Sequence, residues 1–180
     1  MNSLQGKLLI ATPKLADPNF FRAVILMIQH DSDSALGVVL NRPLEMTVKQ
    51  ACEELETDCA VESTLFQGGP CQGPLLVLHT EQDEADGEIV PGLFYTTERE
   101  KVERLLEAEE DPAMKFVVGY SGWGPGQLEA ELEEGSWLLA QPDAEAIFGN
   151  NEAVWMKLKN LITLDGWIDP ERIPPDPSVN

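Results

Sequence analysis

The chain has 180 residues, of which 43% are hydrophobic, and this length and composition fit one globular domain. It carries 32 acidic and 12 basic residues, which gives a formal net charge of −20. That charge repels phosphate backbones, and the basic residues are scattered rather than gathered into a patch. The composition therefore argues against direct nucleic-acid binding.

The cysteines and the apolar runs indicate the cellular compartment of the protein. Cys52, Cys59 and Cys71 are an odd number of cysteines, without the spacing of a disulfide framework or a metal knuckle. The first residues, 1–7, lack the charged and apolar regions of a signal peptide. The longest fully apolar run, 23–28, is too short to span a bilayer. We therefore expect a cytoplasmic protein that does not associate with membranes.

Short apolar or β-branched runs bounded by turn residues predict strands. In chain order these runs cover 7–12, 23–30, 36–40, 65–67, 74–79, 93–96, 115–120 and 136–140. The second and third runs are separated by a turn at 31–34, so we predict that they pair as a hairpin. The acidic, turn-rich stretch over 80–90 predicts an exposed loop.

Capping signals and apolar spacing predict the helices. Thr47 and Gln50 match a capping box, and Thr97 and Glu100 match a second one. Gly135 stands where the terminal glycine of a short helix is expected. The predicted helices begin near 47 and 97 and cover 128–134 and 151–164.

The order of these elements indicates the fold class. Strands and helices do not alternate as in repeated βαβ units, which favours an α+β fold with a mixed sheet over a doubly wound fold. No repeat or interior linker divides the chain, so we predict one domain over 1–168. The segment 169–180 is rich in proline and is predicted to be an extended tail.

The most distinctive motif is the run GYSGWGPGQLE from Gly119 to Glu129. Four glycines and a proline stand between a predicted strand and a predicted helix, where free helix N–H groups favour anions. Gly68 and Gly69 would form a second cradle for an anion. Arg22 or Arg42 would supply the positive charge. The alternative is that the glycines serve tight packing and that Arg42 pairs with one of the many carboxylates.

The motifs give less support to a serine nucleophile, a metal site or a reactive cysteine. The stretch around Ser121 departs from the G-x-S-x-G nucleophile elbow at its last position, Trp123, and both histidines precede the serine. His30 and His79 each end a predicted strand but lack ligand spacing, so we expect structural histidines and no metal site. Cys71 has no neighbouring base, so its thiol is expected to be ordinary.

The acidic and aromatic residues after the motif predict mostly structural roles. Glu129 and Glu131, two residues apart on a helix, point to different faces, so they do not predict a carboxylate pair. Glu129 and Glu133 share a face that we expect to be solvated. Trp123 has glycines on both sides and is expected to be partly exposed, whereas Trp155 is expected in the core, as is Trp137.

The glycine run and several other segments together resemble the YqgE/AlgH family. The resemblance covers about 4–165 and rests on residues in matching order and spacing. They are Leu9-Ile10-Ala11, Pro13, Leu15, Asp17-Pro18, Phe20, Arg22, Val24, His30, Gly37, Asn41, Pro43-Leu44, Gly68-Gly69-Pro70, Leu78-His79, Gly122 to Glu129, Glu131, Trp137-Leu138 and Ile147-Phe148.

The resemblance implies a mixed α+β fold with a bent, barrel-like sheet and helices packed outside it, in a bacterial cytosolic protein. Some members of this family carry the label of transcriptional regulator, through a genetic link to alginate production in pseudomonads. The family brings no established activity and no catalytic residues. The Pro-rich tail after Trp167 departs from the family pattern.

We therefore predict a non-enzymatic regulatory or interaction protein that needs no cofactor and acts through a protein partner or a small anionic ligand. The candidate ligand-binding residues are Asn41, Arg42, Gly68, Gly69, Gly122, Trp123, Gly124, Gly126 and Gln127, with Arg22, His30 and His79 as nearby polar groups. The alternative is an enzyme of unknown reaction that uses the same loops. An enzyme should hold His30 or His79 within about 3 Å of a polar partner in a cleft lined by the glycine loops.

Overall fold

The computed structural model describes residues 3–15, 17–54, 61–107, 113–149 and 154–165. The strands in these residues are β1 (Leu8–Ala11), β2 (Val24–His30), β3 (Ala35–Val39), β4 (Pro43–Thr47), β5 (Thr64–Gln67), β6 (Cys71–His79), β7 (Gly87–Val90), β8 (Leu93–Thr96), β9 (Met114–Trp123) and β10 (Trp137–Ala140). The helices are α1 (Val48–Glu54), α2 (Arg99–Glu107), α3 (Gln127–Glu133), α4 (Ala144–Phe148) and α5 (Val154–Asp165), with 3₁₀ turns η1 (Pro18–Phe20) and η2 (Gln82–Glu84).

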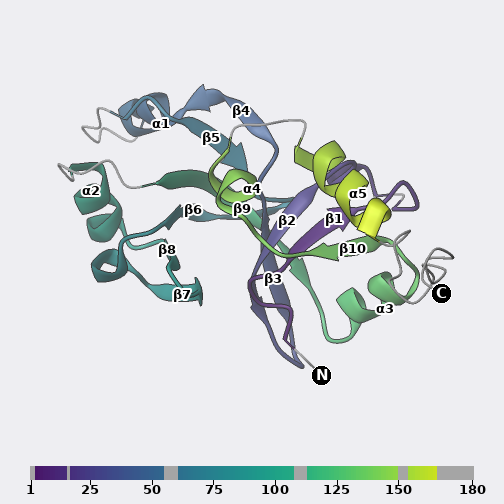
Figure 1. The fold of residues 1–180 in the computed structure, drawn as a ribbon. Helices are drawn as coiled ribbons and strands as arrows, with labels where there is room; N and C mark the ends of the chain where they lie inside the picture. The colour runs from purple at the N-terminus through teal and green to yellow at the C-terminus, as the bar shows by residue number, and fades with distance from the viewer. Residues whose placement is uncertain (1–2, 16, 55–60, 108–112, 150–153, 166–180) are drawn as a thin grey trace, which may run out of the picture.

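The strands form one strongly curled sheet, open on one side like a half-barrel (Figure 1). Its main path is β10-β1-β2-β3-β9-β6-β8-β7, and β4 and β5 form a branch from β9. The β5–β9 pair is parallel, whereas the other pairs are antiparallel. The predicted α+β class with a mixed, bent sheet is therefore confirmed.

Strand β9 joins the two halves of the sheet. Its first residues pair with β5 and β6, and its last three, Ser121 to Trp123, pair with β3. Gly119 lies just after the last residue paired with β5 and within an irregularity of the β6 pairing, with a φ of +73°, a left-handed conformation that glycine adopts without strain. A Cβ at Gly119 would lie 2.6 Å from the Cys71 carbonyl oxygen. The glycine therefore lets β9 turn from one set of partners to the other while β6 packs closely.

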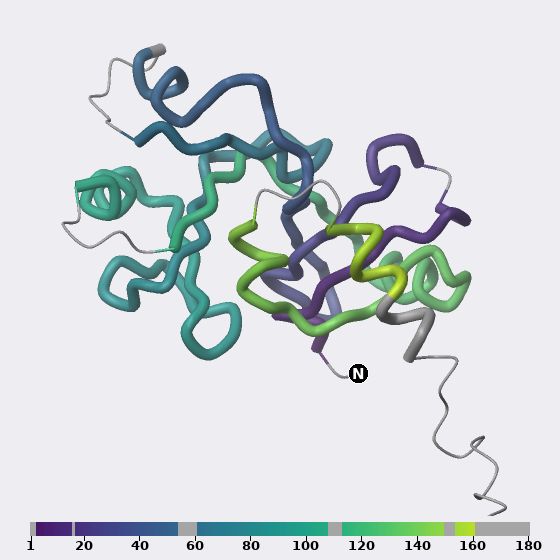
Figure 2. Tube along the Cα trace, turned by 45° about the horizontal axis from the view of Figure 1, so that its top comes forward, coloured from purple at the N-terminus to yellow at the C-terminus, as the bar shows by residue number. Residues whose placement is uncertain are grey.

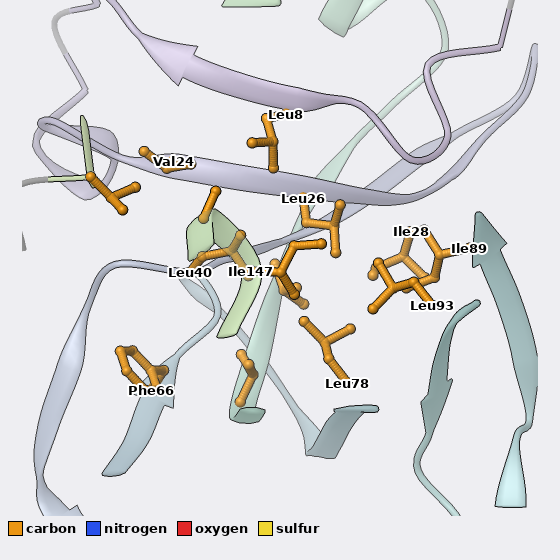
Figure 3. Close-up of a cluster of buried hydrophobic side chains, with 14 of the residues drawn as sticks. Leu8, Val24, Leu26, Ile28, Leu40, Phe66, Leu78, Ile89, Leu93 and Ile147 are labelled. Carbon is orange, nitrogen blue, oxygen red and sulfur yellow. The ribbon is translucent and has the colours of Figure 1, made fainter. Parts of the chain in front are cut away.

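The largest apolar cluster fills the inside of the curl. Figure 3 shows Ile28 of β2 beside Ile89 of β7 and Leu93 of β8, so the far end of the sheet meets strand β2 across the core. Ile147 of α4 lies among these side chains. The Gln5 side-chain amide donates to the Ile89 carbonyl at 3.3 Å, which ties the N-terminal segment to the same edge. Burial of apolar surface from both halves stabilises the curl.

Several predicted local signals are confirmed. Strands β2 and β3 pair as the expected hairpin. The Thr47 hydroxyl accepts from Gln50 N at 3.3 Å, and the Gln50 side chain accepts from Thr47 N at 2.9 Å, which is a complete capping box. Gly135, with a φ of +75°, ends α3 through the paired backbone bonds of a Schellman motif, Gly135 N to Leu132 O and Ser136 N to Glu131 O.

Other predicted boundaries were wrong, because long-range contacts decide them. The stretch over 80–90, expected to be a loop, contains η2 and strand β7, which pairs with β8. The start of α2 is capped by Asp86 rather than by the expected box, since Asp86 accepts from Thr97 N at 2.6 Å and from Glu98 N at 3.3 Å. Strand β4 over Pro43–Thr47, which pairs with β5, was not predicted.

Two predictions reach beyond the described residues. The helix expected over 151–164 is seen from Val154 onward as α5. The predicted tail over 169–180 lies outside the described residues. Within them, no helix has the length and apolar character needed to cross a membrane.

Replacing Gly119 by alanine is expected to destabilise the fold by at least about 1–2 kcal/mol, because the left-handed conformation penalises a Cβ and the Cys71 carbonyl leaves no room for it. Chemical denaturation measures this loss. Gly124→Ala is the matched control, since nothing lies within 4 Å of a Cβ at that position. Equal unfolding free energies for the two variants would contradict the role given to the bend.

Candidate functional site

The turn before β2 is held in an unusual conformation by Asn41. Arg22 has a φ of 54°, the one positive φ outside glycine in the described residues. Asn41 Nδ2 donates to the Arg22 carbonyl at 2.8 Å, and Asn41 Oδ1 accepts from Val24 N at 2.9 Å. Such a backbone costs about 1–3 kcal/mol and is found preferentially at functional sites. The sequence-predicted pair Asn41 and Arg22 is thus brought together by direct contact.

A cavity of about 300 Å³ lies beside this turn. Its walls come from the segment after β1, from the Arg22 turn and from α5, which lies alongside them (Figures 1 and 2). We call it the Arg22 pocket, and its lining residues are Thr12, Pro13, Leu15, Phe21, Arg22, Trp155, Met156 and Lys159. Phe21 is 66% exposed and Met156 is 45% exposed, so the pocket opens onto an apolar rim.

The Arg22 guanidinium lies between aromatic rings. Its central carbon is 5.0 Å from the Phe21 ring centroid and 5.3 Å from that of Trp155, distances typical of cation–π contacts. Trp155 is fixed in turn, because its Nε1 donates to the Ala11 carbonyl at 2.7 Å. Lys159 Nζ lies 5.1 Å from the same indole ring. Within the described residues, the Arg22 guanidinium makes no hydrogen bond and no ion pair, so its donors face the pocket or solvent.

Arg42 supports the same turn from the other side. Its Nη2 donates to the Phe21 carbonyl at 3.4 Å, and its own carbonyl accepts from Gln67 N at 2.9 Å. Burial lowers the pKa of the Arg42 guanidinium and the charge of Asp17 raises it, which leaves the group cationic at neutral pH. A second positive charge therefore lies next to Phe21.

Gly68 and Gly69 lie close to the backbone of β9. A Cβ at Gly68 would meet the Gly119 carbonyl oxygen at 2.3 Å, and one at Gly69 would meet Ser121 Oγ at the same distance. The Gly68 N–H donates to the Val118 carbonyl at 2.8 Å, and its carbonyl accepts from Ser121 Oγ at 3.1 Å. The tight-packing alternative therefore describes Gly68, whose amide is already bonded.

The loop over 122–127 is closed by Glu131, a residue that the sequence did not single out as a partner. Glu131 Oε2 accepts from the indole Nε1 of Trp123 at 3.0 Å and from that of Trp137 at 2.7 Å. Glu131 Oε1 accepts from Gln127 Nε2 at 2.9 Å, and Gln127 Oε1 accepts from Gly124 N at 3.2 Å. Trp123 is 4% exposed, so the expectation of partial exposure was wrong.

The two groups of candidate residues lie at opposite ends of β3. Trp123 pairs with Ala35 and Gly122 with Leu36 at the start of the strand. Asn41 and Arg42 follow its last residue. The glycine loop, including Gly126 as the N-cap of α3, is therefore separated from the Arg22 pocket by the length of β3.

His30 meets the geometric condition set for a histidine at an active site. Its Nε2 lies 2.8 Å from Glu129 Oε1, and both residues line a cavity of about 430 Å³ together with Ser3, Asp31, Ser32 and Gly126. His30 Nδ1 accepts from Leu4 N at 3.0 Å, so the neutral ring carries its proton on Nε2 and donates to Glu129. The bond to its own backbone amide and the His30 ring lower the pKa of Glu129. Both ring nitrogens are engaged, and the histidine ties the N-terminal segment to α3.

His79 lies far from both groups, fully buried on β6. In the described part of the chain, neither of its ring nitrogens has a hydrogen-bond partner, and the same holds for Thr96 Oγ1. Burial lowers the pKa of His79, and the Glu81 backbone and the carboxylates of Asp86 and Glu84 oppose this only in part. His79 is therefore neutral at pH 7, and its ring is an uncharged side chain in the core.

Sequence reasoning missed most walls of the Arg22 pocket. The sequence predicts Trp155 as a core residue of the helix over 151–164, and it does not single out Phe21 or Lys159 as site residues. One signal was available, since Trp155 and Lys159 are four residues apart and therefore share a helix face beside an aromatic-flanked arginine.

This fold and these sites define a mixed α+β protein whose curled sheet carries a cationic, aromatic pocket at one end. A family model described as AlgH-like (DUF179) matches residues 8–166. The chain therefore belongs to the AlgH-like family, and the family predicted from the motifs is confirmed.

Curated relatives support this membership over most of the chain. The UPF0301 protein CT0663 of Chlorobaculum tepidum is 40% identical over 158 residues, which is 84% of this chain and 83% of that protein. A UPF0301 protein of Myxococcus xanthus is 38% identical over 156 residues, which is 83% of this chain and 85% of that protein.

Solved structures share the fold. The solution structure of the AlgH protein from Pseudomonas aeruginosa matches with a TM-score of 0.76 at 27% identity, covering 89% of this chain and 88% of that chain. The crystal structure of protein DIP2367 from Corynebacterium diphtheriae matches with a TM-score of 0.67 at 24% identity, covering 88% and 86%, and supports the fold alone.

Replacing Glu131 by glutamine is expected to destabilise the protein by about 1–3 kcal/mol, because a neutral amide cannot accept from both indoles and from Gln127 as the carboxylate does. Denaturant unfolding followed by tryptophan fluorescence measures the change. Glu133→Gln, on the exposed side of the same helix, is the control and should stay within about 0.5 kcal/mol of the parent. Equal losses in both variants would show that Glu131 does not close the loop.

The buried His79 is expected to make stability fall as the pH drops below its ordinary pKa of about 6.5. The pKa of His79 is lower in the folded than in the unfolded state, so the unfolded chain binds more protons in this range. In His79→Leu, the unfolding free energy should depend less on pH between about 6.5 and 5. Denaturation at a series of pH values measures this, and parallel curves for parent and variant would contradict it.

Proposed function

We propose that this protein is a non-enzymatic binding protein with a regulatory or interaction role, and that it takes an anionic group, phosphate or carboxylate, in the Arg22 pocket. The observation that carries this proposal is the Arg22 guanidinium, which lies over a cavity between two aromatic rings without a counter-ion in the described residues.

The charge balance of the chain makes this arginine unusual. With 32 acidic and 12 basic residues, a basic side chain has many carboxylates to pair with, as Arg104 does with Glu84 at 2.8 Å. Arg22 has no such partner among the residues that the structure describes, so its donors are available to a ligand. Its flat fork suits two oxygens of a phosphate or carboxylate at once.

The surroundings of Arg22 favour a ligand that also has an apolar part. Phe21 and Met156 are exposed at the rim, and the Trp155 ring forms part of the wall. Lys159 adds positive charge on the same wall. A small molecule with an anionic head and a flat or apolar body fits this combination, as does an acidic partner segment with an apolar side chain.

The pocket is also preorganised. Asn41 holds the turn by donating to the Arg22 carbonyl and accepting from Val24 N, and Arg42 donates to the Phe21 carbonyl. A site fixed before binding loses less conformational entropy when the ligand arrives. The strained Arg22 backbone therefore fits a binding site, where it fixes the position of the guanidinium. In an ordinary surface turn the same strain would only reduce stability.

A second candidate function, an enzyme of unknown reaction, is favoured by the His30–Glu129 contact of 2.8 Å in a cavity of about 430 Å³. In this arrangement the histidine donates to Glu129, which leaves the carboxylate as the group that faces a substrate. We rank it second because His30 Nδ1 is occupied by Leu4 N, so the ring has no free acceptor for proton transfer.

Ligand binding at the Arg22 pocket is expected to raise the thermal stability of the full chain. A ligand at about 100 times its dissociation constant stabilises a fold by roughly 2.7 kcal/mol, which is a visible shift in melting temperature. The measurement is a thermal-shift screen of inorganic phosphate, nucleotides and small carboxylates, with calorimetry on each hit. We expect a hit whose shift disappears in Arg22→Gln and is reduced in Arg42→Ala.

Arg104→Gln is the matched control, because it removes one positive charge outside the pocket. If Arg22→Gln and Arg104→Gln lost the melting-temperature shift equally, the shift would depend on net charge alone. That result would overturn the proposal that the Arg22 pocket binds the ligand. The same mixtures, followed by NMR, separate the two candidate functions. Consumption of a compound that stops in Glu129→Gln would favour the enzyme.

A further inference from the structure

A lysine is buried at the other end of β9. Lys115 is 2% exposed, and it is the one lysine among the buried polar residues of the described chain. Its strand position pairs with Leu78 of β6, and Leu78 belongs to the apolar cluster inside the curl. Lysine is almost never fully buried unless its ammonium group is paired.

The partners of Lys115 do not neutralise its charge. Its Nζ donates to the Gly149 carbonyl at 2.7 Å and lies 4.1 Å from the centroid of the Phe66 ring. Within the described residues, no carboxylate lies at ion-pair distance from it. Burial without a counter-ion disfavours the ammonium form and lowers the pKa of Lys115 to about 8. A substantial share of this side chain is therefore a neutral amine with a free lone pair near physiological pH.

Lys115 lines a small polar cavity of about 190 Å³. Besides Lys115, the lining residues are Glu62, Ser63, Thr64, Phe66, Met114 and Phe148. This cavity is distinct from the Arg22 pocket and from the cavity beside His30, which have other lining residues. Its size admits a molecule of a few heavy atoms, since a water occupies about 30 Å³ of liquid. Glu62 at the wall and the net charge of the chain disfavour an anionic occupant.

We propose that Lys115 is a covalent acceptor for a small uncharged aldehyde, which it binds as an imine in this cavity. The Nζ lone pair attacks the carbonyl carbon, the C=O π bond breaks, and a proton moves from nitrogen to oxygen to give a carbinolamine. Loss of that hydroxyl with a second nitrogen proton releases water and forms the C=N bond. Ser63 and Thr64, two hydroxyl residues, line the same cavity, and no oxidant or reductant takes part.

Reductive trapping on the full chain tests this proposal. The protein is incubated with propionaldehyde over pH 6 to pH 10, the imine is reduced with borohydride, and each lysine is followed by peptide mapping. At pH 7 to 8 we expect Lys115 to be modified at least about tenfold faster than the exposed lysines, since its neutral fraction is far larger. Its rate should level off above about pH 8. A bulky aromatic aldehyde should not reach it.

Lys115→Met removes the amine and keeps an apolar stem, and it should abolish the fast-modified site. Lys14→Met, at an exposed lysine, is the matched control and should leave that site intact. The site-resolved rates of the unmodified protein decide the proposal even if Lys115→Met does not fold. Modification of Lys115 no faster than that of exposed lysines at every pH would overturn it, as would modification only after denaturation.

Discussion

The change of partners along β9 is the constraint on which the rest of the molecule depends. One ten-residue strand must satisfy β5 and β6 along its first part and β3 along its last three residues. A straight strand could not turn from one half of the sheet to the other, and Gly119 supplies the turn. Gly68 and Gly69 pack closely against the same part of this strand. The first glycine of the most distinctive motif, Gly119, therefore determines the path of the backbone.

Three charged or titratable groups stand apart from the rest of this acidic chain. Arg22 is held over a pocket without a counter-ion, Lys115 is buried without one, and His79 is buried without a hydrogen-bond partner, each within the described residues. Burying a charged or polar group without a partner reduces stability. Lys101, by contrast, is paired with Asp86 at 2.6 Å, as partly buried charges usually are. Burial would raise the pKa of Asp86, but hydrogen bonds from Lys101 and Thr97 lower it to about 2.

Sequence reasoning succeeded where the signal is local and failed where the partner is distant. The Thr47 capping box, the Gly135 terminus and the β2–β3 hairpin each depend on residues a few positions apart. Strand β7 escaped prediction because its acidic, turn-rich sequence becomes a strand only by pairing with β8. The family and the bent sheet were predictable because several motifs keep their order and spacing over most of the chain.

The candidate site was also predicted only in part, because some of its residues are distant in the sequence. Asn41, Arg22 and Arg42 were predicted together, and Asn41 and Arg42 do hydrogen-bond to the turn that holds Arg22. The glycine loop was expected in the same cleft, but it lies at the opposite end of β3. Trp155 and Lys159 complete the pocket from α5, more than a hundred residues further along the chain, and no spacing rule links them to Arg22.

The distance in sequence between the walls of the Arg22 pocket has a kinetic consequence. The pocket unites the segment around Thr12 with Trp155 and Lys159, so it closes only after the sheet has formed and α5 has docked. Contacts of such long separation form late in folding, because the chain must first lose the entropy of a large loop. During synthesis on the ribosome the pocket stays incomplete until α5 has emerged. A ligand that needs the whole pocket would thus recognise only finished molecules and would slow the undocking of α5.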